Sequence, residues 1–219
     1  PKEQIVGYVR EILDFLGSKD IDAAIIACNT ATAAAWEEVK DEYPFPVLGV
    51  IKPGVRGALA TTANKKVGVV ATQFTIDSEA HKSGIQAKDP AIEVIGQACP
   101  KFTLLVESGV TSGPEVDEAV SGYFETFKNS GIDTLVLGCT HYPVLLDTIR
   151  RYVDSGVTII DPAVEAVAEA KELVEEMKKD VAGDASVYNF YTSGDPDLFA
   201  KVGSTILGWQ IDKVDKVVL

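Results

Sequence analysis

The sequence predicts an α/β protein made of two similar units, each with a parallel sheet covered by helices. Helical and strand-like segments alternate along nearly all of the 219 residues, which is typical of parallel strands joined by helices. Two distant segments also share one pattern. "IDAAIIACNT" at residues 21–30 and "IDTLVLGCTHYP" at 132–143 align without a gap from Ile-Asp to a cysteine, about half a chain length apart. We therefore expect two pseudo-symmetric units.

The first half of the chain begins with an amphipathic pattern. Apolar residues recur at helical spacing over 3–16, and Gly17 is expected to end that helix. The apolar run 23–27 is too short for a helix, so it predicts a strand buried on both faces. The other elements expected here are a helix at 30–43 ending before Pro44, strands at 47–51 and 66–72, and a helix that opens at Pro53.

The second half repeats this alternation. Ser112 is expected near the N-cap of a helix at 112–131 that Gly131 ends, and Asp161 is expected to cap a helix with Pro162 in its first position. The other elements expected here are strands at 91–99, 134–138, 157–160 and 186–193, and helices at 143–153 and 197–208.

The pattern shared by the two cysteine segments also suggests where the two domains divide. We expect boundaries near residues 50–53 and near 161. Residues 1–52 and 162–219 would then form a first, discontinuous α/β domain, and residues 53–161 a second. No low-complexity linker is visible, so the two domains are expected to pack closely.

Composition excludes several classes of protein. Hydrophobic residues make up 46% and charged residues 24% of the chain, as in globular proteins. The net charge of −13 argues against nucleic-acid binding, because a phosphate backbone is bound by clustered Lys and Arg. The acidic stretch 165–180 is interpreted as a solvated helix face. With no apolar segment of about 20 residues and no signal peptide, we expect a cytoplasmic protein without a membrane partner.

Three cysteines, an odd number, do not suggest a disulfide framework. Cys28 and Cys139 each follow a predicted strand, at the edge where ligands bind in parallel sheets. The amino end of a following helix lowers the pKa of a thiol from about 8.5 and so favours a base. Free N–H groups there, with the Asn29 amide and the Thr30 and Thr140 hydroxyls, would hold a small carboxylate.

If the two units face each other, Cys28 and Cys139 approach one ligand from opposite sides, and a thiolate and a thiol together can invert a stereocentre. This chemistry needs no metal or redox partner, and the chain has no GxGxxG or P-loop motif. His141 could form a hydrogen bond near the Cys139 thiol and so help to position its proton, and Glu107 could orient that histidine. Inert packing for each cysteine and a structural loop role for His141 are the alternatives. Cys99 has no counterpart in the repeat and is interpreted as structural.

Four segments carry a resemblance to a known family: "ACNTATA" around Cys28, "GVVAT" with Thr72 and Thr75, "ACPKFTLLVESG" at 98–109, and "LGCTHYPVL" around Cys139. Together they span most of the chain, which resembles the glutamate racemases of the aspartate/glutamate racemase family. The resemblance implies two pseudo-symmetric α/β domains with the active site between them.

The resemblance also implies a function and roles for individual residues. It implies cofactor-independent interconversion of L- and D-glutamate, with D-glutamate supplied for peptidoglycan, and often a homodimer. A racemase acting on aspartate or another amino acid, or a non-catalytic amino-acid-binding module, are the alternatives. Implied catalytic residues are Cys28, Cys139, His141 and Glu107, and implied substrate-binding residues are Asn29, Thr30, Thr72, Thr75 and Thr140.

The sequence departs from the family pattern in two places. Nothing in it matches the family's N-terminal strand ending in Asp-Ser-Gly or the later Pro-Tyr-Gly segment, so the aspartate expected to assist Cys28 is not in this sequence. Asp161-Pro162-Ala163 also replaces a more usual Asp-Ser-Gly, which keeps a helix start but removes a hydroxyl. We expect a longer form to racemise glutamate and this stretch alone to be impaired.

Overall fold

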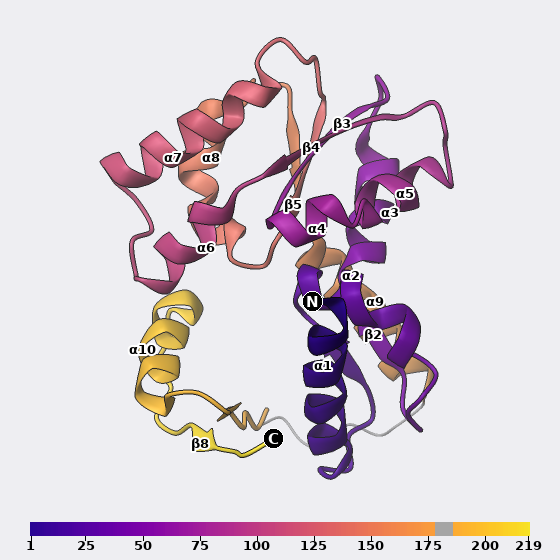
Figure 1. The fold of residues 1–219 in the computed structure, drawn as a ribbon, viewed down its shortest axis with the longest axis vertical. Helices are drawn as coiled ribbons and strands as arrows, with labels where there is room; N and C mark the ends of the chain where they lie inside the picture. Colours follow the sequence, from indigo (N-terminus) through magenta and orange to yellow (C-terminus); the bar gives the residue numbers. More distant parts are fainter. Residues whose placement is uncertain (178–185) are drawn as a thin grey trace. The chain divides into compact units, whose positions relative to one another are not determined.

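The computed structural model describes residues 1–177 and 186–219 (Figure 1). The chain divides into two compact units, Pro1–Glu176 and Met177–Leu219. The helices of the first unit are α1 Lys2–Gly17, α2 Asn29–Val39, α3 Ile51–Thr61, α4 Gln73–Asp77, α5 Ala80–Gln86, α6 Pro100–Glu107, α7 Pro114–Phe124, α8 Leu146–Tyr152 and α9 Pro162–Glu176, with 3₁₀ turns η1 Glu125–Phe127 and η2 Tyr142–Leu145. Its strands are β1 Ala24–Ile26, β2 Val47–Gly49, β3 Lys66–Ala71, β4 Glu93–Ala98, β5 Thr134–Gly138 and β6 Thr158–Ile160.

The largest sheet has four parallel strands in the order β4-β3-β5-β6. Ala71, the last residue of β3, pairs with both Ala98 of β4 and Gly138 of β5. The three strands therefore end level with one another, and the residues that follow them leave the sheet at the same edge. This edge is the carboxyl end of the parallel strands, where ligands bind in sheets of this kind.

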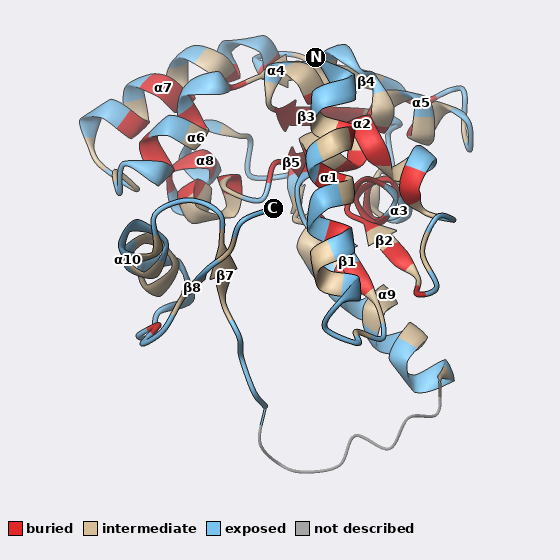
Figure 2. Cartoon of the chain, turned by 60° about the horizontal axis from the view of Figure 1, so that its bottom comes forward, coloured by how far each residue is buried: buried red, intermediate tan, exposed pale blue. Residues whose placement is uncertain are grey.

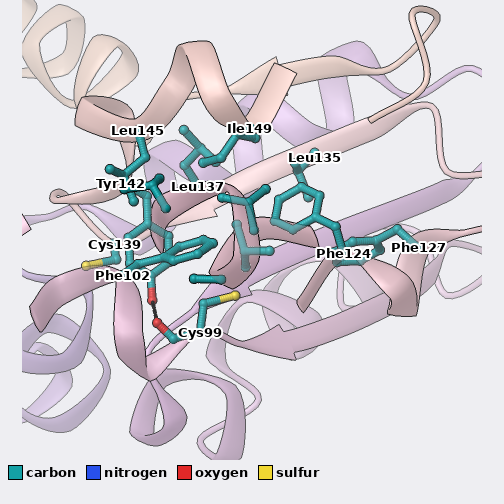
Figure 3. Packing of buried hydrophobic residues seen from close by; sticks show 14 of the residues in the cluster. Cys99, Phe102, Phe124, Phe127, Leu135, Leu137, Cys139, Tyr142, Leu145 and Ile149 are labelled. Atoms are coloured by element: carbon teal, nitrogen blue, oxygen red, sulfur yellow. Dashed lines mark hydrogen bonds between the residues drawn. The ribbon is translucent and has the colours of Figure 1, made fainter. Parts of the chain in front are cut away.

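The central strands β3 and β5 are buried on both faces of this sheet, and neighbouring side chains along each strand point to opposite faces. On one face, Val67, Val69 and Val136 pack with residues of α3 and α5. On the other, Leu135 and Leu137 pack into the largest core cluster, with residues of α6, α7 and α8 (Figures 1 and 3). Buried residues are visible on β3 and on one side of α7 in Figure 2. The predicted layered architecture, a parallel sheet with helices on both faces, is confirmed.

A smaller parallel sheet joins β1 and β2. Val9 of α1, Ile26 of β1, Val39 of α2 and Val47 of β2 belong to a separate core cluster. Only one face of β1 is buried, because Ile25 on the other face is 41% exposed. The prediction that this strand is buried on both faces was wrong: its pleat alternates between core and surface.

The sheet of β1 and β2 lies within residues 1–52, and the four-stranded sheet lies within 53–161. The division of the chain into the two expected domains stays a prediction.

The ends of the helices agree in part with those expected from the sequence. The Asp161 carboxylate accepts a hydrogen bond from the Ala163 N–H at 2.9 Å, as expected of the residue before α9. The helix expected at 112–131 is shorter in the structure: Ser112 directly precedes Gly113, the N-cap of α7, and the helical turns end with η1 at Phe127. Gly113 has a φ of 99°, which a glycine adopts without strain. Of the acidic stretch 165–180, residues 178–180 lie outside the described residues.

Asp133, just before β5, ties the start of that strand to the loop after α3. Its carboxylate accepts hydrogen bonds from the Thr62 hydroxyl and from the Ala63 and Asn64 N–H groups, all at 2.7 Å, and from the Thr134 hydroxyl at 2.9 Å. Burial raises the pKa of Asp133, but these hydrogen bonds together lower it below its ordinary value.

The second unit, described over residues 177 and 186–219, contains β7 Tyr191–Thr192, α10 Pro196–Leu207 and β8 Asp215–Lys216. The two strands pair in parallel, and the strand expected at 186–193 is thus shorter than expected. The Asp195 carboxylate caps α10 by accepting from the Asp197 and Leu198 N–H groups. Phe190 packs against Phe199 and Trp209, which gives this unit an aromatic centre.

Candidate active site

Cys28 is the residue at which strand β1 gives way to helix α2. It is the N-cap of the helix in an extended conformation, and its sulfur accepts a hydrogen bond from the Ala31 N–H at 3.5 Å. The side chain is exposed and unpaired with another cysteine. The sulfur therefore lies at the amino end of α2, beside the backbone N–H groups of the first helical turn.

Cys139 follows the last residue of β5 and lies beside an imidazole that is held by a carboxylate. Its sulfur is 3.7 Å from His141 Nδ1, and His141 Nε2 is 2.5 Å from Glu107 Oε1. The hydrogen bond with the Cys139 sulfur, opposed by partial burial and assisted by Glu107, raises the pKa of His141 to about 9. A protonated His141 can donate to the sulfur with one nitrogen and to Glu107 with the other.

Three threonine hydroxyls connect the Cys28 segment to the edge of the four-stranded sheet. Thr30 Oγ1 is 2.8 Å from Thr72 Oγ1 and 3.2 Å from Thr75 Oγ1, and the last two are 3.0 Å apart. Thr72 follows Ala71, whose partner in the sheet is Gly138, and Cys139 follows Gly138. The threonine triangle (Thr30, Thr72 and Thr75) therefore joins the start of α2 to the strand next to the one that carries Cys139.

Asn29, the first residue of α2, is only 2% exposed. Neither its amide nitrogen nor its amide oxygen has a hydrogen-bond partner in the part of the chain that the structure describes. A buried amide without partners costs free energy unless another group binds it. Its position beside Cys28 suits an amide that contacts a ligand.

Cys99 differs from the other two cysteines. It is fully buried in the largest core cluster, where burial raises the pKa of its thiol. Its carbonyl oxygen accepts a hydrogen bond from the Tyr142 hydroxyl at 2.9 Å. Figure 3 shows its sulfur among the packed side chains, whereas the Cys139 sulfur lies at the margin of the cluster. This placement agrees with a structural role for Cys99.

The predicted site residues thus fall into two described groups. Cys139, His141 and Glu107 form one, and the threonine triangle with the neighbouring Cys28 and Asn29 forms the other. Thr140 is exposed at the turn after Cys139.

Sequence reasoning missed two residues near this edge. Thr103 on α6 has its hydroxyl 3.8 Å from the Cys139 sulfur. The His81 imidazole is 3% exposed and lies next to Gly138, since a Cβ built on that glycine would be 3.2 Å from His81 Cε1. Helical spacing from Glu107 was the available signal for Thr103, and no signal in the sequence pointed to His81. In residues 1–177 and 186–219, His, Cys, Asp and Glu side chains form no cluster of three that could hold a metal ion.

Comparison with known proteins assigns the chain to a family. The Asp/Glu/Hydantoin racemase family model matches residues 2–170. The chain belongs to this racemase family. It is 39% identical to a glutamate racemase of Enterococcus faecalis over 219 residues, which are 99% of this chain and 80% of that protein. It is 40% identical to a glutamate racemase of Oceanobacillus iheyensis over 207 residues, 94% of this chain and 76% of that protein.

Solved structures of racemases agree with this assignment. The glutamate racemase isoform RacE1 of Bacillus anthracis superposes with a TM-score of 0.91, and a Francisella tularensis glutamate racemase in complex with D-glutamate superposes with a TM-score of 0.92. Each is 32% identical and covers 100% of this chain, which spans 82% and 81% of theirs. The predicted α/β racemase fold is confirmed. No helix in the described residues is long and apolar enough to cross a membrane.

Proposed function

We propose that this racemase-family chain interconverts L-glutamate and D-glutamate, with Cys28 and Cys139 as the two acid/base groups. The observation that carries the proposal is the chain of contacts from Cys139 through His141 to Glu107, which lies at one edge of the four-stranded sheet. The threonine triangle connects the same edge to the turn that carries Cys28. The relatives named glutamate racemase, similar over nearly the whole chain, support glutamate as the substrate.

The proposed reaction transfers a proton without redox change. A thiolate on one face of the substrate removes the α-proton and becomes a thiol, leaving a carbanion conjugated with the carboxylate. The thiol on the other face then donates its proton to the same carbon and becomes a thiolate. Configuration is inverted and the two cysteines have exchanged protonation states, so solvent exchange restores the starting form. No step requires a cofactor.

His141 and Glu107 support the Cys139 side of this cycle. With Cys139 as the base, an imidazolium at His141 stabilises the thiolate, and Glu107 holds that imidazolium in place. On the Cys28 side, the helix amino end takes the corresponding part. Asn29, the threonine triangle and Thr140 are proposed to bind the substrate's polar groups, because amides and hydroxyls offer donors to carboxylates and acceptors to an ammonium group.

The test follows the α-proton and the chirality separately. The purified chain is incubated with L-glutamate in deuterated water, and chiral chromatography with mass spectrometry measures D-glutamate and deuterium at the α-carbon. Cys28→Ser and Cys139→Ser should each reduce racemisation by at least about 10³-fold, because a serine hydroxyl is a far weaker acid than a thiol, so it seldom ionises to act as the base and donates its proton poorly. Cys99→Ala, which removes the buried third thiol, is the matched control and should retain turnover.

Each alternative predicts a different result. Deuterium incorporation into aspartate and not glutamate would assign the chain to another amino-acid substrate. Glutamate binding without any exchange, both in this chain and in a longer form that carries the family's N-terminal strand, would favour a non-catalytic module. Exchange that survives both serine variants would refute the two-thiol mechanism.

Supply of D-glutamate for peptidoglycan, a cytoplasmic location and a homodimer belong to the same proposal. Dependence of a glutamate-racemase-deficient bacterium on this chain for growth without D-glutamate tests the first. Cell fractionation tests the second, and sedimentation of the purified chain tests the third.

A further inference from the structure

Helix α6 presents two polar side chains toward Cys139. Thr103 and Glu107 are four residues apart, so they lie on the same face of the helix. Glu107 acts through His141, whereas the Thr103 hydroxyl is itself 3.8 Å from the Cys139 sulfur. The sulfur therefore has two polar neighbours, the His141 ring at 3.7 Å and the Thr103 hydroxyl.

The Thr103 hydroxyl also has a second neighbour, the hydroxyl of Tyr142. Burial raises the pKa of Tyr142, and the neighbouring Thr103 side chain acts in the opposite direction. The phenolic proton is already used, because the Tyr142 hydroxyl donates to the Cys99 carbonyl at 2.9 Å. The oxygen of Tyr142 is thus available as an acceptor for Thr103. One threonine proton lies between two acceptors.

We propose that Thr103 is a positioning residue for Cys139, with a hydroxyl that donates to the sulfur when it is a thiolate and turns to Tyr142 when the sulfur is protonated. A thiolate is a strong acceptor and a thiol sulfur a weak one, so the preferred acceptor changes with the protonation of Cys139. The hydroxyl keeps its own proton in both arrangements. Because it has a partner in each, neither form of the sulfur leaves a partly buried donor unsatisfied.

This assignment explains how one cysteine can serve both directions of a racemisation. Cys139 must be a thiolate when it accepts the α-proton and a thiol when it delivers one. The positive charge of the His141 imidazolium favours the thiolate, whereas a hydroxyl that rotates stabilises the thiolate without opposing the thiol. The inference rests on the proposed function for its catalytic meaning, but the contact with the sulfur is tested independently of turnover.

The experiment measures alkylation of Cys139 in the purified chain. Iodoacetamide is added at about pH 7, and mass spectrometry of the Cys139 and Cys28 peptides gives a rate for each. Thr103→Val, which replaces the hydroxyl with a methyl group, should slow Cys139 alkylation about tenfold, since it removes a hydrogen bond to the thiolate. The Cys28 rate in the same sample should not change, and Thr103→Ser should restore the Cys139 rate.

Two further variants sharpen the test. Thr126→Val makes the same replacement at a threonine that bonds to Gln97, and it should leave Cys139 alkylation unchanged. Tyr142→Phe removes the alternative acceptor, so Thr103 should donate to the sulfur alone, and Cys139 should react at least as fast as in the unmodified chain. If Thr103→Val does not fold, the comparison of Thr103→Ala with Thr103→Ser replaces it.

Equal Cys139 rates with and without the Thr103 hydroxyl overturn the proposal, and so does slower alkylation in Tyr142→Phe. Turnover is measured in the same variants, where a positioning role predicts a lower kcat with little change in KM. Altered Cys139 reactivity in a chain that does not racemise glutamate would retain the Thr103 contact and reject the proposed reaction.

Discussion

The buried imidazole of His81 should make the stability of this protein depend on pH in a defined window. The side chain is 3% exposed, and neither ring nitrogen has a hydrogen-bond partner in residues 1–177 and 186–219. Burial disfavours its charged form and lowers the pKa of His81 from 6.5 to about 4. Glu79 and Lys82 line the same cavity of about 150 Å³, but they pair with each other at 2.7 Å.

The direction and size of the effect follow from this difference. Between about pH 6.5 and 4, the unfolded chain binds a proton at His81 that the folded chain does not, so the free energy of unfolding falls as the pH falls. At about 1.4 kcal/mol for each pH unit, the difference between 6.5 and about 4 gives a full loss of about 3 to 4 kcal/mol below pH 4. Linkage gives about 2 kcal/mol of this loss between pH 7.5 and pH 5.

The assay is urea unfolding followed by circular dichroism at several pH values between about 7.5 and 5. His81→Phe and His81→Leu remove the titrating group, and the loss on acidification should be about 2 kcal/mol smaller in either variant than in the unmodified chain. Comparing slopes with pH removes any change in packing, because a packing effect is the same at every pH. Glu79→Gln is the matched control and should keep the slope. If the free energy of unfolding falls equally with pH in the unmodified chain and in both His81 variants, the proposed effect of His81 is refuted.

Three other substitutions have expected outcomes. Glu107→Gln should lower the pKa of His141 from about 9, because the carboxylate that favours the imidazolium is lost. Proton NMR titration of the His141 ring measures this pKa, and an unchanged titration would contradict the contact with Glu107. Asp133→Asn should reduce the free energy of unfolding by about 2 kcal/mol at neutral pH, because four donors lose a charged acceptor. The difference from the unmodified chain should shrink in acid, where the Asp133 carboxylate is protonated, and urea unfolding at both pH values measures it. A difference that does not change with pH would argue against a role for the charge. Tyr142→Phe should reduce the free energy of unfolding by about 1 to 3 kcal/mol, since the buried Cys99 carbonyl loses its hydrogen-bond donor. A melting temperature equal to that of the unmodified chain would contradict this expectation.

Elements with strong local signals were predicted well from the sequence. The apolar run at 135–138 lies within β5, and Cys139 follows it as expected, because a strand buried on both faces is largely apolar. Cys28 likewise marks the change from a short apolar run to a helix. The exposure of Ile25 was not predictable, since an apolar run does not reveal which of its faces will be covered.

Contacts between distant segments were the hardest part of the site to predict. Thr103 and Cys139 are 36 residues apart, and the spacing of Thr103 from Glu107 indicates only that the two side chains share a face of α6. His81 lies between charged residues in the sequence, a context that suggests exposure, and only the packing of α5 against the sheet buries it. The roles of Thr72 and Thr75 came from the resemblance, and that of Thr30 also came from its place after Cys28. The mutual hydrogen bonds of the three hydroxyls depend on how distant segments fold together.

The threonine triangle has a limit set by proton counting. Three hydroxyls contribute three protons, and closing the ring of hydrogen bonds among Thr30, Thr72 and Thr75 uses all of them. An anion arriving at this ring can gain a donor only by opening one of its sides. Anion capture would therefore loosen one of the three contacts that join the beginning of α2, the end of β3 and helix α4, and departure of the anion would restore it.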